Sequence, residues 1–210
     1  MLDLRTLSVG PVDNRSYLLT DARAGGSGSW LLVDAANDAD RLLALLDEAV
    51  PAGSRGVGTI VTTHRHDDHV QALEAVAGAT RATTAAGEDD ADALPRVPDV
   101  RLGHGAVVVV GEHELQVIAL RGHTPGSVAL LAPAGVVDDG LPHLFTGDSL
   151  FPGGPGKTWS PEDFTSLMDD LEDRVFAVLG DDVVVHPGHG ETTTLGAERP
   201  RLQEYRDRGW

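Results

Sequence analysis

The stretch His64-Arg65-His66-Asp67-Asp68-His69 places three histidines and two aspartates within six residues. It directly follows an apolar run at residues 58–63, Gly-Thr-Ile-Val-Thr-Thr, which predicts a buried strand. Neutral imidazole and carboxylate are the usual nitrogen and oxygen ligands of zinc and related divalent metals. The segment has the form H-x-H-x-D-H and can supply ligands to two different metal ions, so it indicates hydrolytic metal chemistry.

The spacing within this motif separates its ligands into two groups. His64 and His66 are two residues apart at the end of the predicted strand, so in an extended chain both side chains point to the same side. Asp68 and His69 come after the chain turns toward a helix and can face a neighbouring metal. A catalytic metal takes three protein ligands and keeps one position for water, so further ligands must come from downstream.

Three downstream residues are candidates for these missing ligands. They are His123 in residues 122–127, Asp148 in residues 145–151 and His189 in residues 187–190. Each lies at the end of a predicted strand, in a loop rich in glycine or proline. Loops at strand ends are common places for functional sites, and glycine lets the backbone approach a metal closely.

Composition limits the class of protein. The chain has 210 residues, 41% hydrophobic and 23% charged, which predicts one globular domain over residues 1–210 with two similar halves, roughly 1–105 and 106–210. A net charge of −17 argues against nucleic acid or an anionic membrane surface as partner. No cysteine is present, so disulfides and thiolate ligands are excluded. We see neither a signal peptide nor an apolar run of ~20 residues, and expect a cytoplasmic protein.

Hydrophobic periodicity predicts an alternation of short strands and helices. Strands are expected at residues 2–9, 16–20, 30–34, 58–63, 106–110, 114–119, 128–131, 143–146 and 182–185. Helices are expected at residues 38–50, 68–77, 161–179 and 195–208, with a Gly/Ser loop at 25–29 and an acidic surface loop containing a short helix at 86–98. This order suggests two sheets face to face with helices outside.

These motifs resemble those of the metallo-β-lactamase-fold hydrolases, and most closely the glyoxalase II-like (hydroxyacylglutathione hydrolase-like) thioesterase branch. The matching segments are residues 63–69, 122–127, 145–151 and 187–190, with weaker matches at 13–18 and 32–34. Together they extend from about residue 10 to 195 and cover nearly the whole chain. The resemblance implies an α/β (α+β) fold, a four-layer αββα sandwich with a dinuclear site between the sheets.

The resemblance also implies a role for each candidate ligand. Two divalent metal ions are expected, with zinc as the first choice and iron or manganese as alternatives. The ligands would be His64, His66 and His123 for the first metal, Asp68, His69 and His189 for the second, and Asp148 as a bridge between them. Asp34 would steady the ligands from behind, a task that outer carboxylates often perform.

Two dications about 3.5–4 Å apart lower the pKa of a water that lies between them. We therefore expect a metal-bridged hydroxide that hydrolyses small acyl thioesters, with Asp68 and Asp148 as catalytic carboxylates.

Lys157, in the glycine-rich run 153–158, is expected to contact a substrate carboxylate, with plain exposure as the alternative. The final segment, 202–210, is too short to replace the helical C-terminal domain that binds glutathione in full-length glyoxalase II, so another small thiol ester is expected. The chain would be a monomer or homodimer.

Other functions stay open at this point. A persulfide dioxygenase would hold a single iron through His64, His123 and Asp148, although the loop after Asp148 lacks the arginine expected from those relatives. A lactonase would differ only in the lining of its pocket. A non-enzymatic metal-binding role is the third alternative, although a structural site closes its coordination sphere with fewer ligands. By distance alone His186 is an alternative to His189 as a ligand.

Overall fold

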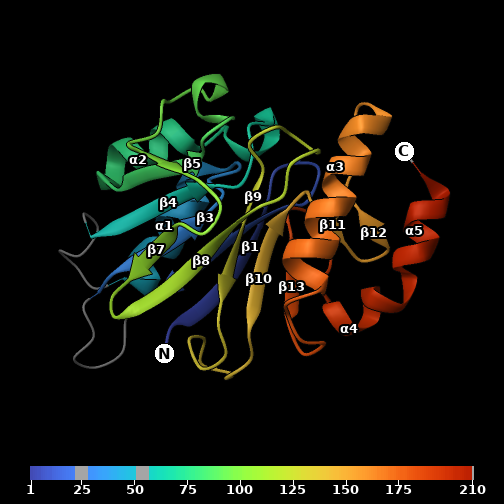
Figure 1. Cartoon of the computed structure of the whole chain (residues 1–210). Helices are drawn as coiled ribbons and strands as arrows, with labels where there is room; N and C mark the ends of the chain where they lie inside the picture. The colour runs from blue at the N-terminus through green and yellow to red at the C-terminus, as the bar shows by residue number, and fades with distance from the viewer. Residues whose placement is uncertain (22–27, 51–56, 210) are drawn as a thin grey trace.

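The computed structural model describes residues 1–21, 28–50 and 57–209, and the predicted Gly/Ser loop at 25–29 lies mostly outside them. Two six-stranded sheets form the centre of the described chain (Figure 1). The first contains, in spatial order, β1 (Asp3–Val9), β2 (Asn14–Thr20), β3 (Trp30–Val33), β4 (Gly58–Thr62), β5 (Thr83–Gly87) and β6 (Val100–Leu102). The second contains β14 (Thr193–Thr194), β13 (Val184–Pro187), β10 (His143–Gly147), β9 (Val128–Ala132), β8 (His113–Ala119) and β7 (Val107–Val110).

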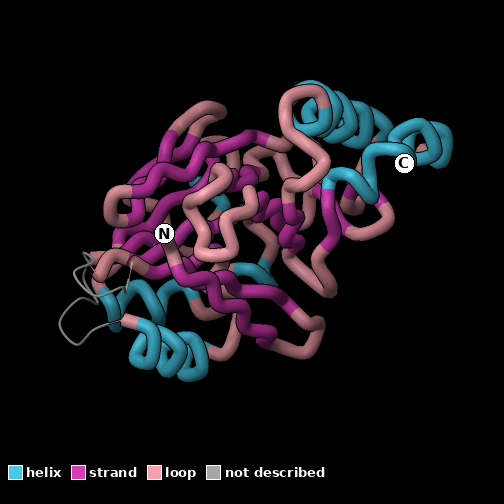
Figure 2. The backbone as a smooth tube through the Cα atoms, turned by 90° about the horizontal axis from the view of Figure 1, so that it is seen from below, coloured by secondary structure: helices cyan, strands magenta, loops and turns pink. Residues whose placement is uncertain are grey.

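Helices cover the outer face of each sheet. The first sheet packs against α1 (Ala39–Ala49) and α2 (Leu73–Thr80), and the second against α3 (Pro161–Leu171), α4 (Leu195–Glu198) and α5 (Leu202–Arg208). A short hairpin of β11 (Leu150–Phe151) and β12 (Gly154–Pro155) lies near α5. Figure 2 shows the strands between helices on two opposite sides.

Three apolar clusters hold these layers together. One lies between the first sheet and its helices, one between the two sheets and one between the second sheet and α3 and α5. The middle cluster is filled largely by aliphatic side chains, with Tyr17 and Phe145 as its aromatic members. The arrangement confirms the predicted four-layer αββα sandwich. No helix in the described part of the chain is long and apolar enough to cross a bilayer.

The single helix predicted at residues 68–77 is wrong. A 3₁₀ turn at Asp67–His69 comes first, and α2 begins only at Leu73. Between them the amides of Gln71 and Ala72 donate to the carbonyls of Ala36 and Ala35 at 3.0 and 3.1 Å. These two amides therefore do not donate to helical carbonyls. The helix is interrupted here, and His69 lies outside α2.

The prediction for residues 86–98 is also wrong at its start. Residues 86 and 87 belong to β5, whose T-T-A-A-G sequence carries little strand signal because alanine and glycine are depleted in strands. The following strand, β6, spans only three residues and was not predicted either. Two further predicted helices, 161–179 and 195–208, are interrupted. A π-helical turn at Glu172–Phe176 follows α3, and a 3₁₀ turn at Arg199–Arg201 separates α4 from α5.

Gly87, at the end of β5, lies where the first half of the chain approaches the second half closely. A Cβ at this position would lie 1.9 Å from the backbone oxygen of Gly126, and backbone cannot move aside cheaply. We expect Gly87→Ala to lower the free energy of unfolding by about 1–3 kcal/mol, measured by urea denaturation. At Gly103, just after β6, an added Cβ would meet no atom within 4 Å, so Gly103→Ala is the control. Equal midpoints for both variants would contradict the close approach.

Candidate metal centre

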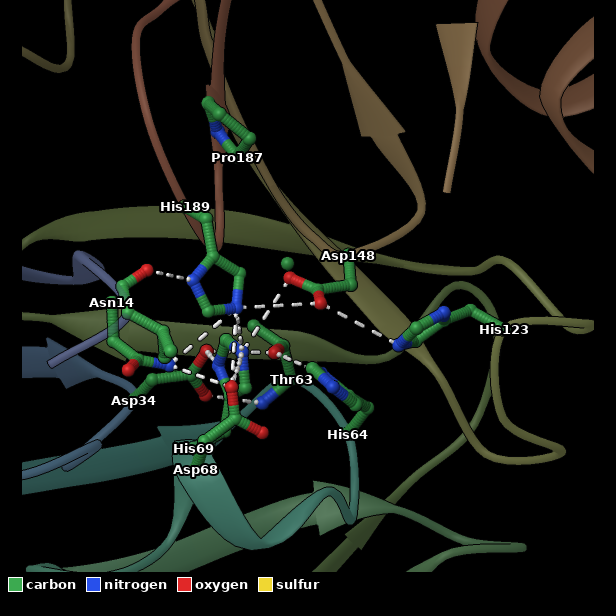
Figure 3. Close-up of polar contacts among 12 residues, drawn as sticks. Asn14, Asp34, Thr63, His64, Asp68, His69, His123, Asp148, Pro187 and His189 are labelled. Carbon is green, nitrogen blue, oxygen red and sulfur yellow. Dashed lines mark hydrogen bonds and ion pairs between the residues drawn. The ribbon is translucent and has the colours of Figure 1, made fainter. Parts of the chain in front are cut away.

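The seven predicted ligands come from both halves of the chain and lie close together. Figure 3 shows six of them, His64, Asp68, His69, His123, Asp148 and His189. His64 and His66 follow β4, and three others come from the loops after β8, β10 and β13. Three sets have ligand atoms within 4.8 Å of one another: His64, His66 and His123; His64, His69 and Asp148; and Asp68, His69 and His189. The structure therefore brings together every residue that the sequence nominated as a ligand, while their roles on a metal stay predictions.

The carboxylate of Asp148 lies between the groups. Its Oδ2 is 3.6 Å from His123 Nε2 and 3.5 Å from His189 Nε2. Its Oδ1 is 3.4 Å from His69 Nε2. Asp148 is thus within reach of histidines from both sides, which is the position that a bridging ligand needs.

Two of the histidines are oriented by backbone carbonyls. His123 Nδ1–H donates to the carbonyl oxygen of Lys157 at 2.7 Å, and His189 Nδ1–H donates to that of Val12 at 2.9 Å. A carbonyl can only accept, so the proton sits on Nδ1 in both rings. Nε2 of each ring is left as the atom that can bind a metal.

The buried carboxylate of Asp34 orients the other side of the site. It accepts hydrogen bonds from the Thr63 amide and hydroxyl, both at 2.7 Å, and from His69 Nδ1–H at 2.8 Å. Because the Thr63 hydroxyl gives its proton to Asp34, its oxygen accepts from His64 Nδ1–H at 3.0 Å. One carboxylate therefore turns Nε2 of both His64 and His69 toward the centre, and the role of Asp34 in steadying metal ligands stays a prediction.

Burial and charge set the protonation of the centre. Burial lowers the pKa of His69, but the carboxylates of Asp34 and Asp148 outweigh it and raise that pKa to about 10. Burial, together with the charge on His69, holds the pKa of His64 well below its ordinary value. Burial acts to raise the pKa of Asp148, yet the neighbouring rings of His189 and His69 hold it well below its usual range. At neutral pH Asp148 is an anion, His64 is neutral and His69 is a cation whose proton a metal must displace.

The donor set fits divalent cations. Three buried ligand atoms have no hydrogen-bond partner among the described residues: His64 Nε2, His123 Nε2 and Asp148 Oδ1. Buried polar atoms without a partner are uncommon in folded proteins. All three are acceptors that face the centre, and a cation bound there would satisfy each of them.

Gly188 shows how closely the backbone approaches this centre. A Cβ at this position would lie 2.2 Å from Asp148 Oδ1 and 2.6 Å from His69 Cε1. Its amide donates to the carbonyl of Gly147 at 2.9 Å, which ties the loop after β13 to the loop after β10. A side chain at residue 188 would displace Asp148 or His69, so the predicted need for glycine in this loop has a direct steric cause.

Asp90 is a residue of the site that sequence reasoning missed. It was taken as part of an acidic surface loop, but it is fully buried. Its carboxylate accepts from the amides of Arg65 at 3.1 Å and Gly126 at 2.9 Å, and from the Thr124 hydroxyl. Asp90 thereby fastens the loop of His64 and His66 to the loop of His123.

Asn14 is a second missed residue. Its Nδ2 donates to Asp68 Oδ2 at 3.0 Å and lies 3.5 Å from His189 Nε2 (Figure 3). The weak motif match at residues 13–18 included Asn14, and this match was the available signal.

Two other predicted candidates lie outside the ligand groups. Lys157 contributes its carbonyl to His123, and its Nζ lies 4.4 Å from the centroid of the Trp159 ring. His186 lies 2.8 Å from His143, ring nitrogen to ring nitrogen, and belongs to none of the ligand sets found in the described residues. The geometry therefore favours His189 over His186 as the ligand of this loop.

Comparison with known proteins agrees with this fold. The family model of the metallo-beta-lactamase superfamily matches residues 9–189. The chain belongs to this superfamily. Among curated proteins it is similar to the hydroxyacylglutathione hydrolase of Fuscovulum blasticum, with 34% identity over 179 residues, 84% of this chain and 62% of that protein. The enzyme of the same name from Cereibacter sphaeroides (ATCC 17023) is 38% identical over 147 residues, 69% of this chain and 51% of that protein. The chain thus spans less than two thirds of the length of either relative.

Solved structures give the same architecture. ETHE1 from Myxococcus xanthus superposes with a TM-score of 0.78 and 27% identity, covering 96% of this chain and 84% of that chain. A protein described as TTHA1623 in a di-iron-bound form superposes with a TM-score of 0.72 and 28% identity, covering 93% and 96%. The predicted resemblance to the metallo-β-lactamase fold and its glyoxalase II-like branch is confirmed.

The raised pKa of His69 predicts a proton release on metal binding. At pH 8 an ordinary histidine is already neutral, whereas His69, with a pKa of about 10, still carries its proton. Zinc must displace that proton, and affinity should rise with pH. Calorimetric zinc titration at pH 8 in buffers of different ionisation enthalpy measures the released protons. Asp34→Asn removes the charge that raises this pKa, so we expect it to release fewer protons; equal release by both proteins would contradict the assignment.

Asp90→Asn tests the link between the two histidine loops. The side-chain nitrogen of asparagine cannot accept a hydrogen bond from a backbone N–H. One of the two loops therefore loses its hydrogen bond to residue 90. We expect zinc affinity to fall by about tenfold or more, as is usual when support behind metal ligands is lost. Competition with a chromogenic chelator measures the affinity. Asp99→Asn, at a carboxylate that accepts from Thr84 on the far end of β5, is the matched control. Unchanged affinity in Asp90→Asn would show that the loops hold their positions without it.

Proposed function

We propose that this protein is a metal-dependent hydrolase that acts on small acyl thioesters. The observation that carries the proposal is the convergence of two three-ligand groups on Asp148. The names of the curated relatives, hydroxyacylglutathione hydrolases, support the thioester as the bond that is cleaved. Zinc is the expected metal, with iron or manganese as alternatives that suit the same nitrogen and oxygen ligands.

The residues have distinct tasks in this proposal. Two divalent ions held by the five histidines and two aspartates would activate water and polarise the substrate carbonyl. Asp148, with 13% of its side chain exposed, lies between both groups and fixes their spacing. Asp68 has 37% of its side chain exposed, so we assign it the exchange of protons with solvent. The chain has no cysteine, so the acyl group cannot pass to a protein thiol.

The experiment is hydrolysis of S-lactoyl thioesters of several thiols by zinc-loaded protein, followed by detection of the free thiol. We expect turnover by the wild type and a loss of at least about 100-fold in Asp148→Ala, since this carboxylate serves both metals. Asp92→Ala, at an exposed carboxylate paired with Arg101, is the control. No turnover of any thioester by protein with two metals bound would exclude the function.

One observation favours a second candidate, a persulfide dioxygenase with a single iron. The three buried atoms without partners belong to His64, His123 and Asp148, the set expected to hold that iron. Three of the other ligands, Asp68, His69 and His189, lie close to one another, with His69 Nε2 3.1 Å from His189 Nε2. Elemental analysis of the purified protein separates the two functions. Two zinc ions per chain favour hydrolysis; one iron, with oxygen uptake in the presence of a persulfide, favours the dioxygenase.

A further inference from the structure

A buried carboxylate on α3, Asp170, contacts the loop that carries His123. Asp170 is 3% exposed, on a helix that packs against the outer face of the second sheet (Figure 1). Its carboxylate accepts from the backbone amide of Arg121 at 2.9 Å and from two nitrogens of the Arg121 guanidinium at 2.9 and 2.8 Å. The residue two positions before His123 is therefore held through both its backbone and its side chain.

A second arginine joins this contact to the end of β8. Arg174, in the π-helical turn after α3, lies 3.2 Å from Asp170 Oδ1 and donates to the carbonyl of Ala119 at 2.8 Å. Burial acts to raise the pKa of Asp170, but hydrogen bonds from Arg121 and the charge of Arg174 outweigh it and keep that pKa below its ordinary value. Asp170 is thus a buried anion that is stable only while both arginines stay in place.

Gly122, directly before His123, packs against the same helix. Its backbone has a φ of 139°, and a Cβ at this position would lie 2.3 Å from the carbonyl oxygen of Asp163 and 2.7 Å from Leu167 Cβ. Both of those residues belong to α3. The loop therefore lies directly on the helix, with its backbone in contact at the residue that precedes the candidate ligand.

The backbone on the two sides of His123 is held by two different buried carboxylates. After His123, Asp90 accepts from the hydroxyl of Thr124 and the amide of Gly126. Before it, Asp170 accepts from the loop as described above. The first carboxylate connects the loop to the other histidine loop, and the second connects it to the outer helix layer.

We infer that Asp170 is a positioning residue for His123: it holds the loop backbone through Arg121 so that His123 Nε2 faces the metal. The inference rests on the proposed function, and both candidate reactions include His123 as a ligand. No hydrogen bond or ion pair in the described part of the chain joins Asp170 to any of the seven candidate ligands. Its influence on a bound metal must therefore pass through the loop.

The first test compares zinc binding by the wild type, Asp170→Asn and Asp169→Asn. Asparagine carries no charge and its side-chain nitrogen cannot accept, so the bonds from Arg121 cannot all be kept. We expect Asp170→Asn to bind one zinc ion about tenfold more weakly or worse, as is usual when support behind a metal ligand is lost. Competition with a chromogenic chelator measures the affinity. Asp169→Asn, at the adjacent position of α3 where an exposed carboxylate pairs with Arg206, is the matched control and should bind zinc like the wild type.

The second test separates positioning from stability, because loss of a buried ion pair lowers stability wherever the pair lies. Cobalt(II) is bound in place of zinc, and its visible absorption bands report the geometry of the ligands. We expect Asp170→Asn to change these bands while circular dichroism shows the folded protein. Urea denaturation of the metal-free proteins measures the change in stability separately.

A milder variant is available should Asp170→Asn fail to fold. Arg121→Ala removes the guanidinium but keeps the backbone amide that donates to Asp170. About half of the Arg121 side chain is exposed, so we expect a smaller loss of zinc affinity, about two- to fivefold. In that case, wild-type affinity in Arg121→Ala would overturn the inference.

The failures of the two proposals are distinguishable. Asp170→Asn that unfolds at lower urea concentration but keeps the zinc affinity and cobalt spectrum of the wild type would show a role in stability alone, and would overturn the inference whether or not thioesters are hydrolysed. If no thioester is hydrolysed but Asp170→Asn weakens zinc binding and changes the cobalt spectrum, the thioesterase fails and the positioning role of Asp170 stands.

Discussion

The buried carboxylate of Asp34 links the fold to the metal centre. It lies at the end of β3, in a left-handed backbone conformation with φ of 57°, and receives three hydrogen bonds from Thr63 and His69 just beyond β4. Strands β3 and β4 run parallel, so their carboxyl ends meet at the same edge of the sheet. Burying a carboxylate is costly unless its oxygens are satisfied. The chain can therefore bury Asp34 only with Thr63 and His69 in place, and this requirement fixes the start of the metal-binding motif.

Hydrogen bonds also orient other ligands of the centre. Three more rings are held by a hydrogen bond on the far nitrogen: His123 by Lys157, His189 by the backbone near β2, and His64 by Thr63. These partners come from separate elements, and two of them are carbonyls that no substitution of a side chain removes. Five imidazoles and two carboxylates crowd one space, and the mixture of neutral, cationic and anionic groups is stable in it only because the opposite charges are adjacent. Divalent cations would replace the proton on His69 and keep that balance.

The parts of the fold and of the metal centre that could be predicted are those whose sequence signal lies within one short segment. The seven candidate ligands could be nominated because histidine-rich motifs in a fixed order are rare, and Asp34 followed from the family resemblance. Most strands were predictable because branched residues dominate them. Asp90 was not, because its role depends on Thr124 and Gly126, more than thirty residues away. Residues 83–87 were missed because a strand of alanine, threonine and glycine is recognisable only once its parallel neighbours are known.

The metal centre and the cavity of about 500 Å³ that Lys157, Trp159 and Arg208 line are built in different ways. Ligands such as His69 and Asp148 are buried, fixed by backbone contacts and crowded by Gly188, so small changes there alter several contacts at once. Trp159 and Arg208 lie at an exposed loop and on a terminal helix, where substitutions disturb few packed neighbours. Substitutions in the cavity can therefore change its shape and charge while the residues of the metal centre keep their positions. Because both regions share the loop that carries Lys157, a shift of this loop would still reach His123 through the Lys157 carbonyl.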